Sequence, residues 1–293
     1  MKRHSALMVS LAVVLFANCS SNNDNAHTTA ETRINPPPTQ NLQIVPRPQA
    51  IVDEMRARGE QDEAKPILRI LSPAEGAVIT GSIVVVRIAL DGDLKGYQPH
   101  QDSVTGQGNH IHIILDNEPY EAYYELDQPF ELRNVVAGKH TLRVFPSRPW
   151  HESHKNEGAF QMVTFTVRGG GNASQEARAG NDVQASTAGD VDPTKPLMTY
   201  NRPKGEYKGP EADPMMIDFW LSNAKLKGDG GEYRVRYFVD DDEPRFIDKW
   251  EPVWLSGWLN GKHTVRLELL GPDNWPVKNG DFNVTTREIT VVK

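Results

Sequence analysis

The sequence predicts an all-β protein made of two tandem antiparallel β-sandwiches joined by a flexible linker. Eight segments are rich in β-branched residues, partly alternate between apolar and polar positions, and are bounded by Gly, Pro, Asp or Asn. They fall into two groups of four: 82–90, 110–116, 140–145 and 162–167, then 215–222, 233–240, 263–270 and 287–292. Neither group contains convincing helical periodicity over ten residues, which excludes a mixed α/β architecture.

The two groups also repeat each other. The segment VAGKHTLRVF (136–145) matches LNGKHTVRLE (259–268), and HIHIILDNEP (110–119) aligns with YRVRYFVDDDEP (233–244). Short strands at turn-punctuated spacing within about 100 residues are typical of immunoglobulin-like sandwiches. We therefore expect an internal duplication of one immunoglobulin-like domain.

The amino terminus predicts export. Lys2 and Arg3 precede the apolar run 6–16, which has the length of a signal-peptide core and is too short to cross a bilayer. Cys19, the only cysteine of the chain, follows directly after Phe16-Ala17-Asn18. Residues 1–19 resemble a bacterial lipoprotein signal, which implies acylation of Cys19.

The lipobox departs from the usual pattern, because Phe16 and Asn18 stand where Leu and a small residue are common. An ordinary cleaved signal with an incidental cysteine is the alternative. Ser20 after the cysteine implies, by the usual sorting pattern, an outer-membrane lipoprotein of the cell envelope, facing the periplasm or the cell surface. The membrane would then be a partner through the lipid anchor.

Composition divides the rest of the chain. Residues 20–65 are polar and Pro-rich and predict a disordered tether, and 169–194 are rich in Gly, Ala, Ser and Asp and predict a flexible linker. The two sandwiches are expected over 66–168 and 195–293. The formal net charge is −7 without a Lys/Arg block, which argues against nucleic acid as a partner.

Two histidines stand two residues apart in the segment 110–116. Alternation along a strand places Ile111 and Ile113 on the core face and His110 and His112 on the opposite face, which we expect to be exposed. The second copy has arginines at the equivalent positions, so the fold does not require this pair.

His151 and His154 follow in the loop after the GKHT strand, which is expected to lie beside the strand of His110 and His112. Imidazole suits copper and zinc, so the four histidines are candidate metal ligands. The alternative is a plain polar surface without any cofactor. His140 and His263 recur in both copies, and we expect them to form a structural hydrogen bond at the start of their strands.

The first sandwich resembles an uncharacterised family of bacterial exported β-sandwich domains. The resemblance lies in SPAEGAVI (72–79), in the G-x-H-x-H strand (108–116) and in the G-x-H-T-L strand (138–142), and it covers 67–168. It implies an immunoglobulin-like fold and export, and no reaction. The second sandwich lacks the His strand.

Five of six tryptophans lie in the second sandwich, and Trp254 and Trp258 are candidates for an exposed ligand-binding surface; core packing is the alternative. No catalytic motif is present, so we expect no enzyme. The sequence favours a non-catalytic, lipid-anchored envelope protein that binds or scaffolds. The alternatives are an exported copper or zinc binder and an accessory protein for a glycan, a peptide or another envelope protein.

Overall fold

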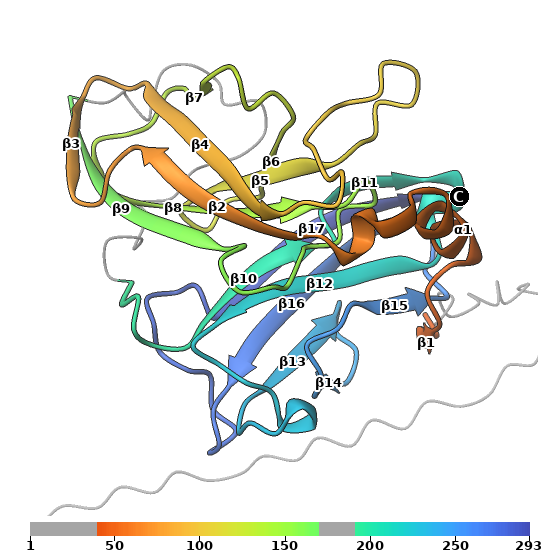
Figure 1. Ribbon diagram of the computed structural model, residues 1–293. Coiled ribbons are helices and arrows are strands. Elements are labelled where there is room, and N and C mark those ends of the chain that lie inside the picture. The colour runs from red at the N-terminus through yellow and green to blue at the C-terminus, as the bar shows by residue number, and fades with distance from the viewer. Residues whose placement is uncertain (1–39, 170–190) are drawn as a thin grey trace, which may run out of the picture. The chain divides into compact units, whose positions relative to one another are not determined.

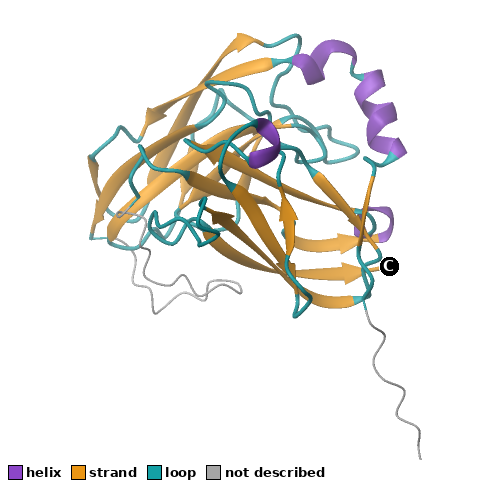
Figure 2. Cartoon of the chain, turned by 90° about the horizontal axis from the view of Figure 1, so that it is seen from below, coloured by secondary structure: helices purple, strands orange, loops and turns teal. Residues whose placement is uncertain are grey.

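The chain is all-β. A computed structural model describes residues 40–169 and 191–293, which belong to one compact unit, Gln40–Lys293. Strands make up most of the regular structure, and the helical segments are few and short (Figure 2). None of the helices in these two described ranges is long and apolar enough to cross a membrane.

The first sandwich consists of two sheets (Figure 1). One has the strand order β2-β4-β7 and the other β3-β9-β8-β5-β6. The strands are β2 (Lys65–Ser72), β3 (Ala77–Thr80), β4 (Val84–Asp93), β5 (His110–Leu115), β6 (Glu121–Tyr123), β7 (Phe130–Leu132), β8 (Gly138–Ser147) and β9 (Gln161–Arg168). All strand pairs are antiparallel except β3 with β9, which is parallel.

The second sandwich repeats this order with one added strand, β1 (Gln43–Val45), at the edge of one sheet. Its sheets are β1-β15-β12-β10 and β11-β17-β16-β13-β14, again with one parallel pair, β11 with β17. The strands are β10 (Leu197–Arg202), β11 (Gly205–Lys208), β12 (Met215–Ser222), β13 (Arg234–Val239), β14 (Arg245–Ile247), β15 (Val253–Ser256), β16 (Gly261–Leu270) and β17 (Val284–Val292). The shared strand order agrees with the predicted repeat, and the two GKHT segments open β8 and β16.

All eight predicted strands are present, and the alternation that identified them has a physical cause. Ile111 and Ile113 of β5 point into the first core beside Leu142 and Val144 of β8, and none of the four is exposed. The strands that the sequence did not reveal are mostly short edge strands, such as β6, β7 and β14. Three residues of such a strand cannot display a period of two.

The predicted tether, 20–65, is wrong for residues 40–65. Strand β1 (Gln43–Val45) pairs with β15, and helix α1 (Gln49–Ala57) and a 3-10 helix (Gly59–Glu63) follow. Polar composition concealed this because the open edge of β15 supplies backbone hydrogen bonds to β1, whatever the side chains are. Leu42 is also buried in the second core. Residues 20–39 of the predicted tether and the signal with Cys19 lie outside the described residues.

The predicted linker, 169–194, lies mostly outside the described residues. Its last residues are part of the second sandwich: Val191 is buried in a small cluster with Leu197 and Phe282. The backbone N–H of Asp192 donates to Asn279 Oδ1 at 2.8 Å.

The two sandwiches share a buried interface inside the compact unit. Arg143 of β8 points away from the first core, is completely buried, and donates from Nη1 to Thr199 Oγ1 of β10 at 2.9 Å. Trp220 of β12 stacks on Phe145 and Phe160, with ring centroids 6.1 and 5.6 Å apart. The outer face of β5 and β8 is therefore covered instead of solvated.

Candidate metal centre

His110 and His112 lie on β5, on the face opposite the first core, as their alternation predicts. The predicted exposure of this face is wrong, because both side chains have 0% relative exposure. The His112 ring stacks on Tyr120 at a centroid distance of 3.5 Å and meets Phe145 edge-on at 5.1 Å. Tyr124 lies 5.1 Å from the His110 ring. An aromatic shell thus replaces the solvent that the strand pattern suggested.

His151 reaches the same place from the loop that follows β8. Its backbone has φ +68°, a left-handed conformation that is uncommon for a residue with a Cβ. Its N–H donates to the Arg148 carbonyl at 2.8 Å, and its own carbonyl accepts from Asn201 Nδ2 at 2.8 Å. Asn201 belongs to β10, so the second sandwich holds the backbone of His151 in position.

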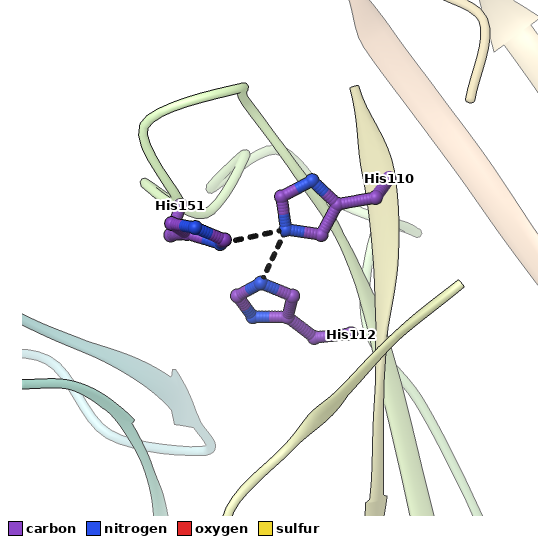
Figure 3. Close-up of side chains that lie close together, drawn as sticks. All are labelled: His110, His112 and His151. Atoms are coloured by element: carbon purple, nitrogen blue, oxygen red, sulfur yellow. Dashed lines mark hydrogen bonds between the residues drawn. The ribbon is translucent and has the colours of Figure 1, made fainter. Parts of the chain in front are cut away.

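The three imidazole rings point at one another (Figure 3). His110 Nδ1 lies 2.8 Å from the Gly108 carbonyl, which only accepts, so Nδ1 carries the proton and Nε2 of neutral His110 carries a lone pair. Two other ring nitrogens point towards this one lone pair: His112 Nε2 at 2.7 Å and His151 Nδ1 at 3.0 Å.

The spacing suits a metal ligand set. One nitrogen from each ring lies within 4.8 Å of the other two. A metal ion about 2.0–2.1 Å from three imidazole nitrogens places them roughly 3.3–3.6 Å apart. His110 Nε2, at 2.7 and 3.0 Å from the other two nitrogens, would therefore have to move roughly half an ångström away from each of them to receive an ion.

Burial keeps all three imidazoles neutral. It lowers the pKa of His110 to about 4, with a smaller effect from the positive charges of Arg202 and Lys204. Burial also holds the pKa of His112 and of His151 well below the usual range. Because a metal ion binds neutral imidazole, coordination at neutral pH requires no net loss of a proton from the three rings.

His112 has one unsatisfied nitrogen. Its Nδ1 is buried without a hydrogen-bond partner among the described residues. Buried polar atoms of this kind are rare, because each loses its interaction with water without compensation. The unsatisfied nitrogen therefore costs folding free energy, and the ring nevertheless lies in the aromatic shell with Nε2 directed at the other two histidines.

His154, the fourth predicted ligand, does not join the group. An antiparallel bridge between Ser147 and Ser153 turns the chain back after His151, so His154 faces the other side of the loop. Its ring is buried edge-on against Tyr97 at 4.8 Å. In the described part of the chain, only His110, His112 and His151 form the ligand group, with no carboxylate or cysteine.

Two cations beside the site were not anticipated. Lys204, between β10 and β11, places Nζ 3.9 Å from the centroid of the Tyr120 ring, and donates to the Tyr120 carbonyl. The Arg202 guanidinium lies 5.4 Å from the same ring. No local spacing could have revealed them, because about 80 residues separate them from Tyr120 in the sequence.

The prediction for His140 and His263 is confirmed. His140 Nδ1 donates to Asp116 Oδ2 at 2.8 Å, and His263 Nδ1 donates to Asp240 Oδ2 at 2.7 Å. In each copy Nε2 donates to the backbone carbonyl four residues earlier. The same carboxylate also accepts from the next backbone N–H, so the pair closes the start of the strand.

The prediction of an exposed tryptophan surface is wrong for both residues. Trp258 is 1% exposed and donates from Nε1 to the Leu255 carbonyl at 2.8 Å, and Trp254 is 7% exposed. They are buried because β1 and the residues before it cover this end of the second sandwich: the Gln40 side chain accepts from the backbone N–H of Leu259 at 3.2 Å.

Comparisons with known proteins assign the chain to no family. No family model matches the chain, and no curated protein matches it. Among solved structures, the fibronectin(III)-like modules of CbhA from Clostridium thermocellum are 11% identical, over 77% of this chain and 94% of that one, with a TM-score of 0.25. The D00-D0 domain of intimin is 11% identical, over 78% of this chain and 100% of that one, with a TM-score of 0.20.

SGBP-B of the Bacteroides ovatus mixed-linkage glucan utilization locus, solved with a mixed-linkage heptasaccharide, is 11% identical, over 77% and 70%, with a TM-score of 0.20. Scores of this size support no argument about this chain. The all-β fold rests on the strand order of the two sandwiches, and the candidate function rests on the histidine geometry.

Proposed function

We propose that this chain is an exported, lipid-anchored envelope protein that binds a transition-metal ion through His110, His112 and His151. The observation that supports this most strongly is the convergence of three neutral ring nitrogens, from two separate elements, at a buried point. Three imidazoles without a thiolate suit copper or zinc. We propose binding and not catalysis, because the ligand group within residues 40–169 and 191–293 holds three histidines and no carboxylate or cysteine.

Metal binding is tested by titrating the purified chain with Cu(I), Cu(II) and Zn(II) against a chromophoric competitor. We expect one ion per chain, and a loss of at least a hundredfold in affinity in His110→Ala and His112→Ala. His100→Ala is the matched control, because His100 is exposed and outside the ligand group. Equal affinities of His112→Ala and the parent would exclude this site.

Lipid anchoring is supported by the sequence alone. Lys2 and Arg3, the apolar run 6–16 and the single cysteine that follows it fit a lipoprotein signal. A clickable fatty acid fed to cells should label the parent and leave Cys19→Ser unlabelled. Equal labelling of the two proteins, or none in either, would contradict the anchor and would leave the metal site untouched.

A groove supports a second candidate function, the binding of an envelope glycan or peptide. A cavity of about 770 Å³ is lined by Ile44 of β1, by Trp250 and Phe246, and by Arg47 and Lys155. Phe246 is 42% exposed, and aromatic side chains of this kind stack on sugars. Binding to a glycan array or to peptidoglycan that Phe246→Ala abolishes would support this function; no binding by the parent would contradict it.

A further inference from the structure

We infer that the three-histidine site takes copper as Cu(I), and that Lys204 and Arg202 of the second sandwich bias it against divalent ions. This inference rests on the proposed metal site. It concerns the charge of the ion that the site accepts, which the ligand set alone does not decide, because imidazole binds Cu(I), Cu(II) and Zn(II).

The charged side chains that act on the three histidines are both cations. The three ligands are neutral, and the charged side chains that act on them are Arg202 and Lys204. Among the described residues no carboxylate belongs to the ligand group. A divalent ion would therefore enter a buried position with no anionic ligand and with two cations nearby.

Both cations are fixed in place. The Tyr120 ring, which stacks on His112 at 3.5 Å, also has the Lys204 ammonium 3.9 Å from its centroid. The Arg202 Nη1 donates to Tyr207 Oη at 2.9 Å, which holds the guanidinium beside the same ring. Burial, with a smaller effect from Arg202, lowers the pKa of Lys204 to about 8, so most Lys204 side chains stay charged at pH 7.

Two physical effects then separate monovalent from divalent ions. The repulsion by a fixed cation is proportional to the charge of the ion, so it is twice as large for Zn(II) as for Cu(I). The cost of moving an ion out of water grows with the square of its charge, and the shell of Tyr120, Tyr124 and Phe145 excludes water. Cu(I) also needs only two or three neutral ligands, whereas Zn(II) takes four.

The test compares affinities for two ions in one pair of variants. Cu(I) affinity is measured anaerobically against bathocuproine disulfonate, and Zn(II) affinity against a pyridylazo dye, with the purified chain. Removing one positive charge in Lys204→Met should raise the Zn(II) affinity on the order of tenfold and the Cu(I) affinity about threefold. Lys204→Gln, which keeps a donor for the Tyr120 carbonyl, should behave in the same way if charge is the cause.

Lys208→Met is the matched control, because Lys208 is exposed and paired with Glu206; both affinities should stay within about 1.5-fold of the parent. The Cu(II)/Cu(I) reduction potential should fall in Lys204→Met and not in Lys208→Met. If the parent binds both ions and Lys204→Met and Lys204→Gln change both affinities equally or not at all, the inference is overturned while the metal site stands. If the parent binds neither ion, the proposed function itself fails.

Discussion

At the residue scale, one pair of equivalent strand positions carries different side chains, with different burial, in the two sandwiches. His110 and His112 of β5 correspond to Arg234 and Arg236 of β13, on the face opposite each core. The arginines remain partly exposed and pair with acidic neighbours, Arg234 with Asp248 and Arg236 with Glu268. The histidines are buried under an aromatic shell. The same positions in the fold therefore carry partly exposed ion pairs in one copy and metal-ligand candidates in the other.

Metal binding should resist moderate acid. Because burial lowers the pKa of His110 to about 4 and keeps the other two pKa values well below the usual range, protons compete with the metal ion only in strong acid. We expect Cu(I) affinity to stay within about twofold from pH 7.5 to 5.5. A peptide of residues 106–116, with solvated histidines, should lose affinity below about pH 6.5. If the Cu(I) affinity of the chain fell with pH in parallel with that of the peptide, burial of the ligands would be contradicted.

His140 should stabilise the fold more in mild acid than in base. Burial alone would lower its pKa, but the hydrogen bond to Asp116 and the charge of that carboxylate raise it overall. The charged pair therefore contributes fully below the unfolded pKa, about 6.5, and its contribution is lost as the pH rises through the higher folded pKa. His140→Gln should cost about 1–3 kcal/mol in urea unfolding at pH 6, and less at pH 9.

A loss that is equal at the two pH values would show that the proton on His140 makes no contribution. His100→Gln serves as the control for the substitution itself, because His100 is exposed. It should change the free energy of unfolding by less than about 0.5 kcal/mol at either pH.

At the scale of elements, β1 shows how a segment of polar composition becomes part of a domain. Gln43, Ile44 and Val45 pair with Ser256, Leu255 and Trp254 of β15, which would otherwise be an open edge. An unpaired edge accepts a strand through its backbone groups, so the segment needs little apolar content of its own. A single buried side chain, Leu42, adds the hydrophobic contact.

Leu42→Ala should therefore destabilise the whole second sandwich. Leu42 is 3% exposed in the core cluster, so its truncation should cost about 2–4 kcal/mol of unfolding free energy. Ile44→Ala is the matched control, because Ile44 is 62% exposed, and should cost less than about 0.5 kcal/mol. Urea unfolding followed by tryptophan fluorescence measures both. If both substitutions lowered the free energy of unfolding by the same small amount, residues 40–45 would act as a tether and not as part of the second sandwich.

At the scale of the whole molecule, the interface between the sandwiches completes the site. Asp218 of β12 is 1% exposed and accepts from Ser153 Oγ at 2.7 Å and from Asn201 Nδ2 at 2.6 Å, and it pairs with Lys155. These contacts hold the loop of His151 from the side of the second sandwich. One ligand of a site in the first sandwich is therefore positioned by the second.

Asn201→Ala should weaken metal binding although Asn201 touches no metal ligand atom. Its Nδ2 holds the His151 carbonyl, and loss of such outer contacts costs on the order of tenfold in affinity. The measurement is competitive titration with Cu(I), together with circular dichroism to confirm folding. Asn223→Ala is the control, because the Asn223 amide donates to the carbonyls of Pro193 and Lys195, away from the histidines. Unchanged affinity in Asn201→Ala would show that the loop positions His151 without the hydrogen bond from the second sandwich.

The sequence by itself determined the class of fold, the repeated strand motif and the structural role of His140 and His263, but not their Asp partners. The three determined properties depend on local features: alternation along β5 and β13, and turn residues before the two GKHT strands. Only the tertiary structure decided that His110 and His112 are buried, that His151 joins them and His154 does not, and that Lys204 and Arg202 lie beside the site. A strand pattern says which residues share a face, but what covers that face comes from segments distant in sequence, and the energy of packing them together has no local signature.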